Sequence, residues 1–328
     1  MTLRLRLASL ALVPVGALLV SYAWSYGTGA IPGFTGTAGT VPVDVNRAMP
    51  GCGQCHRSVP GGNRIDVSVA LGARSLTPGQ QIPVSTTVTG GRPHTGNWGG
   101  FSSDVTGGTF SAGSNSRIDL GGTAVTHTFA HASNNRRWDY GYTAPSTAGP
   151  VDMWVTCNTV DGDGRNGAGD IWAFHGGDGL EMVSTPVRLF VNAAGVTPVG
   201  DSCVGAWKNF PVLGSREPAV AGNANFRIEV IGAAPLAPVV LMIGTPIAPL
   251  DLGLIGINGC WLLVSPAVSI LGATGPGNPK FAEGTGAIAL PLPAGLVANV
   301  RVQAAFSDAL SGRPLPMTVT NALDVSIR

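Results

Sequence analysis

Two cysteines and a histidine stand close together as Cys52, Cys55 and His56, with two residues between the thiols. Thiols at this spacing can form thioethers with the two vinyl groups of a haem, and a histidine that follows at once can bind the iron as proximal ligand. Cysteine and histidine each occur only five times in 328 residues, so chance does not readily explain the combination. The sequence therefore predicts one haem c, covalently held by Cys52 and Cys55, with His56 on the iron.

Two other structures are compatible with this motif. The two thiols can form a disulfide in an exported loop, with the histidine incidental, or the motif can be half of a zinc site. Zinc needs four ligands, and the sequence shows no second close cysteine pair and no His-x-His partner. The motif lies between the Pro-Gly pairs at 50–51 and 60–61, not at the start of an amphipathic helix. Apolar walls for a haem must therefore come from the domain that follows.

The sixth iron ligand decides what a haem at this motif could do. Histidine or methionine there favours electron transfer, whereas an open position allows small-ligand binding or peroxide chemistry. His94 and His131 are the preferred candidates for a distal ligand. The further candidates in the sequence are His127, His175, Met49 and Met153.

An Asp- and Gly-rich segment could bind calcium. Asp161, Asp163 and Asp170 have the oxygen ligands and the close spacing of a Ca²⁺ loop, but the terminal glutamate of an EF-hand is missing. A plain β-turn loop is the preferred interpretation, with calcium as the alternative.

The remaining cysteines fit an exported protein, in which thiols tend to be bridged or ligated. Cys203 and Cys260 both lie in the C-terminal part of the chain, and we expect them to form a disulfide. Cys157 is then left over as a buried thiol.

The N-terminus has the pattern of a secretory signal. Arg4 and Arg6 precede an apolar run over residues 7–20, and small and polar residues follow it. Pro14 and the shortness of the run argue against a membrane anchor, and the C-terminus shows no hydrophobic tail. We therefore expect residues 1–30 to be a signal peptide and the mature chain to be periplasmic, on the cell surface or secreted, with no membrane span.

Composition narrows the fold and the partners. Only 11% of residues are charged, the net charge is +1, and the chain has 48 glycines and 25 prolines. Near-zero net charge gives no electrostatic reason to expect nucleic acid as a partner. No Gly-x-Ser-x-Gly elbow, His-Glu-x-x-His or phosphate-binding loop is visible, so no hydrolase, protease or nucleotide-dependent enzyme is indicated. A peroxidase-type activity at a haem is the one enzymatic possibility.

Hydrophobic periodicity predicts an all-β protein with two β-sandwiches. Period-two patterns appear at residues 65–71, 82–88, 151–157 and 187–191, and Pro83 suggests an edge position for the second of these. A second series of short apolar segments covers 226–230, 239–243, 261–264, 287–290, 298–302 and 323–327. We predict a Gly/Pro-rich lead with the haem loop at 31–61, a first sandwich at 62–191, a linker at 192–201 and a second sandwich at 202–328.

Residues 62–175 resemble the reelin-type (reeler) domain and the related bacterial choice-of-anchor domains of exported proteins. The resemblance rests on the segments Leu76-Thr77-Pro78-Gly79-Gln80, Gly99-Gly100-Phe101, Gly107-Gly108-Thr109-Phe110, Val125-Thr126-His127, Trp138, Tyr142-Thr143-Ala144-Pro145 and Gly149-Pro150-Val151-Asp152-Met153. It implies an immunoglobulin-like sandwich, often preceded by a Cys-x-x-Cys-His loop, with His127 as a structural hydrogen-bonding residue. Residues 202–328 resemble a C-terminal β-domain of secreted planctomycete-type proteins.

These observations lead to two functional hypotheses. The first is an exported mono-haem c-type protein that serves electron transfer or redox-linked binding at the cell exterior. The second is a haem-free extracellular adhesion or structural module in which Cys52 and Cys55 form a disulfide. The redox partner or extracellular ligand has no signature in the sequence.

Overall fold

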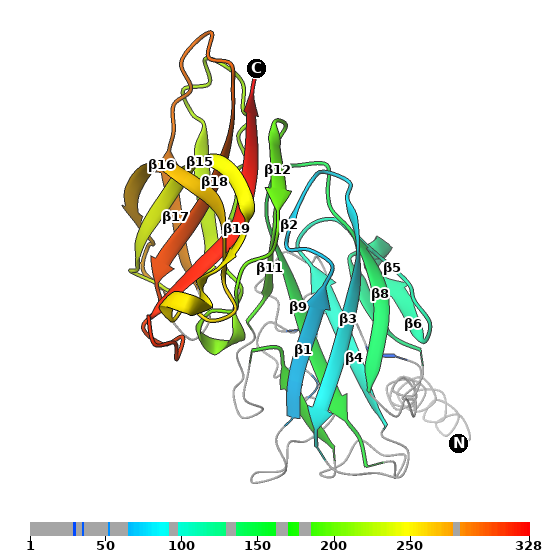
Figure 1. Ribbon diagram of the computed structural model, residues 1–328. Coiled ribbons are helices and arrows are strands. Elements are labelled where there is room, and N and C mark those ends of the chain that lie inside the picture. The colour runs from blue at the N-terminus through cyan, green and yellow to red at the C-terminus, as the bar shows by residue number, and fades with distance from the viewer. Residues whose placement is uncertain are drawn as a thin grey trace, which may run out of the picture.

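The computed structural model describes residues 29–30, 35, 52, 65–91, 98–128, 136–161, 170–176, 185–277 and 283–328. Regular structure there consists of β-strands and short 3-10 helices, and the strands form two sandwiches packed side by side (Figure 1). The all-β prediction is confirmed. Within these residues no helix has the length and the apolar composition of a membrane span.

The first sandwich contains a four-stranded sheet and a larger facing sheet. The neighbour order in the smaller sheet is β1 (Ile65–Leu71), β3 (Gln81–Gly90), β8 (Arg137–Thr143) and β5 (Thr109–Ser111). The order in the larger sheet is β2 (Ser75–Leu76), β11 (Val187–Val191), β9 (Gly149–Thr159), β4 (Gly99–Val105), β7 (Ala124–His127) and β6 (Ser116–Asp119), followed in the chain by η2 (Leu120–Gly122). Strand β10 (Ile171–Phe174) pairs with the C-terminal half of β9.

Alternating side chains from both sheets fill the core between them. Val151, Met153, Val155 and Cys157 of β9 point into this core, as the period-two pattern predicted. The aromatic side chains of β8 pack there as well, and the Tyr140 hydroxyl lies 2.9 Å from Thr86 Oγ1. Burial of these large aromatic side chains adds strongly to the apolar stabilisation of this sandwich.

The prediction that Pro83 marks an edge strand is wrong, because β3 lies between β1 and β8. The carbonyl of Pro83 accepts a hydrogen bond from Gly72 N–H (3.0 Å), just beyond the last residue of β1. In a strand, the N–H and the C=O of one residue point to the same side. The N–H that proline lacks would therefore face the end of β1, where no ladder partner needs it.

The second sandwich contains a five-stranded and a three-stranded sheet. The larger sheet has the order β12 (Val196–Val199), β19 (Met317–Ile327), β18 (Ala298–Ser307), β15 (Pro238–Asp251) and β16 (Trp261–Ala273). The smaller sheet has the order β13 (Val212–Gly214), β14 (Arg227–Ala233) and β17 (Gly284–Ala289), and the 3-10 helices are η3 (Ala206–Lys208) and η4 (Leu252–Ile255). All six predicted segments of this half lie in or overlap strands.

The predicted linker at 192–201 needs correction. Residues 196–199 form β12, which pairs with β19 at the edge of the five-stranded sheet. Val196 is buried, and Pro198 is tolerated because an edge strand leaves one side of its backbone unpaired. The connection between the two sandwiches therefore comprises only residues 192–195.

The two sandwiches share a packed boundary around β2, β11 and β13 (Figure 1). Phe190, Val212 and Ile231 form a small buried cluster there. Ser75 Oγ donates to the carbonyl of Leu213 (3.0 Å), and the side chain of Asn192 accepts from the backbone of Ser215 (3.1 Å). These buried hydrogen bonds fix the relative position of the two units.

Candidate functional site

Of the haem motif, the structure describes Cys52, while Cys55 and His56 lie outside the described residues. The sulfur of Cys52 lies 3.5 Å from Oγ1 of Thr156, near the middle of β9. Because Thr156 alternates with the core residues of β9, its side chain points away from the sandwich core. Cys52 therefore contacts the side of the larger sheet that faces away from the core.

We call this side the outer face, and it is built by outward-pointing residues of four strands. Its members are Ser102 and Asp104 of β4, Thr126 of β7, Trp154, Thr156 and Asn158 of β9, and Trp172 and Phe174 of β10. The strand registers set Thr126, Ser102, Thr156 and Phe174 side by side in one row across the sheet. The Cys52 sulfur is thus close to the centre of the outer face.

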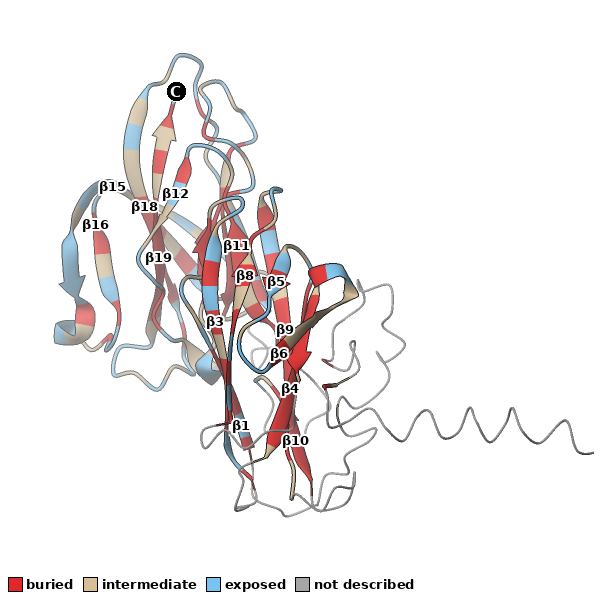
Figure 2. Cartoon of the chain, turned by 90° about the vertical axis from the view of Figure 1, so that its right-hand side faces the viewer, coloured by how far each residue is buried: buried red, intermediate tan, exposed pale blue. Residues whose placement is uncertain are grey.

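The outer face is buried, although it is not part of the core. β4 is buried at every residue, which Figure 2 shows as a continuous red strand. A sheet with one solvated face would show alternating burial instead. The aromatic side chains of β10 are 4% exposed for Trp172 and 1% for Phe174, and their rings meet edge to face at 5.1 Å.

Residues before the first sandwich reach this face at several points. The N–H of Ala30, the last residue of the predicted signal peptide, donates to Thr126 Oγ1 (2.9 Å), and Thr35 Oγ1 of the lead donates to the buried carboxylate of Asp104. Together with Cys52 these contacts fall on three neighbouring strands, β7, β4 and β9. The described residues of the lead therefore attach to the outer face rather than to another surface.

Several polar atoms of the outer face are buried without a hydrogen-bond partner. Among the described residues these include Ser102 Oγ and the indole nitrogens of Trp154 and Trp172. A buried donor without an acceptor costs about 1–3 kcal/mol, so each of these groups is a place where an oxygen acceptor would bind favourably. The outer face thus combines aromatic surface with uncompensated N–H donors.

Some of the histidine and methionine candidates for a distal ligand lie outside the described residues, and the others have identifiable surroundings. His94, His131 and Met49 lie outside the described residues. His127 Nδ1 accepts a hydrogen bond from Phe101 N–H (3.1 Å), so this side chain has the structural role that the family resemblance implied. Its ring fills the space next to Gly100, where a Cβ would lie 2.3 Å from Cε1. Met153 is fully buried in the core, on the opposite side of the sheet from Cys52.

His175 follows β10 and is held in place by its backbone neighbours. Its Nδ1 lies 2.9 Å from the carbonyl of Thr185. Burial lowers the pKa of His175 below its usual value of 6.5, although the Thr185 hydrogen bond opposes this. The imidazole is therefore neutral at physiological pH.

The predicted calcium residues are described only in part. Asp163 lies outside the described residues, and the fully buried Asp170 accepts a hydrogen bond from Asp161 N–H (3.2 Å). Asp170 thereby joins the two ends of the loop at its base. Within the part of the chain that the structure describes, no group of three or more His, Cys, Asp or Glu side chains could hold a metal ion.

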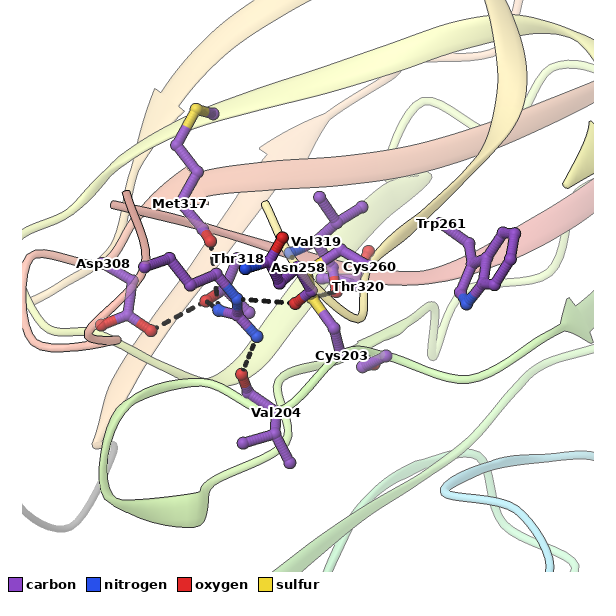
Figure 3. Close-up of a disulfide and its surroundings, with 12 residues drawn as sticks. Cys203, Val204, Asn258, Cys260, Trp261, Asp308, Met317, Thr318, Val319 and Thr320 are labelled. Atoms are coloured by element: carbon purple, nitrogen blue, oxygen red, sulfur yellow. Dashed lines mark hydrogen bonds between the residues drawn. A yellow bond between two sulfur atoms is a disulfide. The ribbon is translucent and has the colours of Figure 1, made fainter. Parts of the chain in front are cut away.

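The other cysteines have distinct environments. Cys203 and Cys260 form a disulfide with a Cα–Cα distance of 4.9 Å (Figure 3). Cys203 also exchanges hydrogen bonds with Val319 of β19, which ties the bond to the sheet. Cys157 is a free, fully buried thiol, and burial raises its pKa well above the usual range, with a smaller contribution from Cys52.

Sequence reasoning missed the outer face because its strands carry weak signals. β4 is Gly- and Ser-rich, and β10 has only four residues. The run Ile171-Trp172-Ala173-Phe174 could have been recognised as a short strand buried on both faces, since it is apolar throughout.

Comparisons with known proteins found similar solved structures but no related sequence. No family model matches the sequence, and no curated protein matches it. Among solved structures, the reelin-N domain of F-spondin is similar at 16% identity and a TM-score of 0.29, over 43% of this chain and 96% of that domain. The major pilin subunit BcpA of Bacillus cereus matches at 8% identity and 0.27, over 81% of this chain and 66% of the pilin. A DUF4466 family protein from Parabacteroides merdae matches at 7% identity and 0.25, over 80% of this chain and 98% of that one.

Proposed function

We propose that this chain is an exported mono-haem c-type protein that transfers electrons at the cell exterior. Haem c supplies reversible one-electron chemistry at its iron. Cys52 and Cys55 would hold the porphyrin covalently, and His56 would bind the iron. The residues of the outer face would form the protein surroundings of the group.

The observation that carries this proposal is the contact between Cys52 Sγ and Thr156. A thioether bond tethers the group to the sulfur, so a haem on Cys52 has to lie next to this point of the sheet. Trp154, Trp172 and Phe174 are buried aromatic side chains of the same face, and a haem there would take the place of what now covers them. The apolar walls that the motif itself lacks are thus available from the adjoining sandwich.

The chemistry of the outer face also fits a group that carries carboxylates. Haem bears two propionates, and the indole N–H groups of Trp154 and Trp172 are buried donors without acceptors among the described residues. A hydrogen bond from a neutral donor to a charged acceptor is stronger than one between neutral groups. The apolar side chains around them exclude water, which tunes the potential of a bound iron.

Haem attachment is tested by expression in a host that has c-type maturation machinery. The protein is denatured, run on a gel and stained for covalent haem, with visible absorbance measured before denaturation. We expect stained, coloured wild-type protein and a complete loss of stain in Cys52→Ser and in Cys55→Ser. Cys157→Ala is the matched control, because this thiol lies in the core outside the motif, and it should keep the stain.

A colourless wild-type protein would overturn the proposal. Peptide mapping without reduction would then show whether Cys52 and Cys55 are bonded to each other. That bond would favour the second hypothesis, a haem-free adhesion or structural module.

The role of the outer face is tested by a pair of tryptophan variants. Trp172→Phe keeps an aromatic ring but removes the N–H on the outer face, whereas Trp138→Phe makes the same change in the core. If the haem lies against the outer face, Trp172→Phe shifts the midpoint potential and the visible spectrum, and Trp138→Phe leaves both unchanged. Equal effects of the two substitutions would show that the haem does not lie against the outer face.

A further inference from the structure

A second candidate binding site lies between the two sandwiches. A cleft of about 480 Å³ opens between β1 of the first sandwich and the segment around η3 of the second. We call it the inter-domain cleft. Its walls include the apolar side chains of Val69, Leu71 and Phe210. A space of this size is in the range of small-molecule sites, which are mostly apolar with a few placed polar groups.

Arg74 contributes a guanidinium to this cleft. The group stacks on the ring of Phe210 at 3.9 Å from the ring centroid, and it makes no hydrogen bond within the described residues. Burial lowers the pKa of Arg74 to about 10, and the nearby carboxylate of Asp201 only partly offsets this. A half-buried guanidinium that makes no side-chain hydrogen bond among the described residues is a candidate for binding an anion.

Two more side chains add unpaired donors to the same cleft. Arg188 uses Nη1 to bind both carboxylate oxygens of Asp152, at 3.1 and 3.2 Å, while its buried Nε has no partner among the described residues. Asn209 Nδ2 is also buried without a partner in the described part of the chain. Both residues line the cleft. These two N–H groups are enclosed in the walls of the cleft, so they reach a bound oxygen acceptor only after a small shift of their side chains.

The charges around the cleft favour a ligand with few negative charges. Arg188 is paired with Asp152, and Lys208 with Asp66 at 2.6 Å. Asp201 lines the cleft near Arg74. Three cations thus face three carboxylates, so the surroundings have no net positive charge to balance a ligand with several negative charges. A single carboxylate needs only one of these cations as its partner.

We propose that the inter-domain cleft binds a small monocarboxylate with an apolar body. Its carboxylate accepts from Arg74, with the N–H groups of Arg188 and Asn209 as further donors, and its apolar body packs against Phe210 and the edge of β1. This site is independent of the haem motif.

The test is calorimetric titration of the full exported chain with octanoate, and with octanamide as the uncharged probe of the same length. We expect octanoate to bind on the order of tenfold more tightly, because a hydrogen bond to a charged group contributes about 1.5–3 kcal/mol. Arg74→Gln should weaken octanoate binding by roughly tenfold or more and leave octanamide unchanged. Inorganic phosphate should bind more weakly than octanoate.

Two further variants keep the test decisive if Arg74→Gln fails to fold. Arg188→Lys retains a cation for Asp152 but loses the Nε donor, and Asn209→Ala removes the amide. Each should weaken octanoate binding. Lys208→Gln is the matched control, since Lys208 is 77% exposed at the rim and paired with Asp66, and it should leave binding unchanged. Equal affinity for octanoate and octanamide, tighter binding of phosphate, absence of binding, or insensitivity to all three donor variants would overturn the proposal.

Discussion

The two sandwiches differ in which surfaces they bury. In the first, the larger sheet is buried on both sides, and the polar side chains of Ser102, Asp104 and Thr156 are inaccessible. In the second, the β15–β16 hairpin leaves apolar side chains in solvent, with Leu254 88% and Leu271 79% exposed. Figure 2 shows the contrast as red along β4 against pale blue and tan over β15 and β16. The first sandwich thus buries both faces of its larger sheet, whereas the second leaves apolar side chains of its β15–β16 hairpin exposed.

The two units are also held together differently. The second sandwich carries the disulfide and the two-point ion pair of Arg301 with Asp324, with contacts of 2.7 and 2.9 Å. The first also has a two-point ion pair, between Arg188 and Asp152, but it has no disulfide among the described residues and adds an aromatic core and contacts with the residues that precede it. We infer that perturbing the outer face lowers the stability of the first sandwich, whereas loss of the disulfide lowers the stability of the second.

The largest effect on stability should come from removing the disulfide. It closes a loop with a sequence separation of 57 residues. The chain-entropy model assigns such a loop about 4 kcal/mol. Cys203→Ala with Cys260→Ala should therefore destabilise the second sandwich by about this amount, measured by denaturant unfolding. Hydrogen exchange should show faster opening of β18 and β19 than of β9.

The matched control is reduction of the wild-type protein under native conditions, which should reproduce the double variant. An equal loss of protection in β9 and β19 would show that the two sandwiches unfold as one unit. The contrast between them would then not extend to stability.

A smaller effect is expected where a glycine makes room for a ring in the first sandwich. Gly100→Ala places a methyl group 2.3 Å from Cε1 of His127 and should cost about 1–3 kcal/mol. In the His127→Ala background the same change should cost much less, because the ring is gone. Urea unfolding of the four proteins measures this coupling. A purely additive result would mean that the clash is relieved elsewhere.

The sequence predicted those parts of the fold where periodicity is strong. β1, β9, β11 and most strands of the second half follow from alternating apolar residues, because one face of each packs on a core. The strands β4 and β10 did not follow, since both faces are buried and alternation disappears. The edge-strand prediction from Pro83 was wrong because a proline in a strand requires only that its own missing N–H has no ladder partner. Strand β1 ends at Leu71, so it offers no partner at this position of β3.

Of the candidate site, only the residues of the proposed covalent attachment were predictable from the sequence. The spacing of Cys52, Cys55 and His56 suggests the proposed haem attachment without any structure, because such an attachment would need nearby residues only. The surface that Cys52 contacts comes from β9 and its neighbours, about a hundred positions later in the chain. The inter-domain cleft was invisible for the same reason, as Arg74 and Asn209 meet only when the two sandwiches pack.

Acid should weaken the first sandwich through His175. Burial lowers the pKa of this imidazole in the folded protein, so the unfolded chain binds more protons as the pH falls through 6.5. The stabilisation is present above this pH and is lost below it, down to the lowered pKa of the folded state. The charged groups near the ring, Arg74, Lys208 and Asp66, modify the shift but not its direction.

Denaturant unfolding of the wild type and of His175→Gln at about pH 7.5 and about pH 5 measures this loss. We expect a smaller dependence on pH in the variant, and hydrogen exchange should place the difference in β10. A variant as sensitive to acid as the wild type would assign the effect to other groups.

The smallest effect belongs to the exposed hairpin of the second sandwich. Leu254→Ala and Leu271→Ala should each change the free energy of unfolding by no more than about 0.5 kcal/mol, since these side chains bury little surface in the chain. Leu241→Ala in the adjacent core is the matched control and should cost about 2–5 kcal/mol, because Leu241 is fully buried. A large cost at Leu254 or Leu271 in dilute solution would mean that another copy or partner covers the hairpin. The second sandwich would then, like the first, be completed by something beyond its own strands.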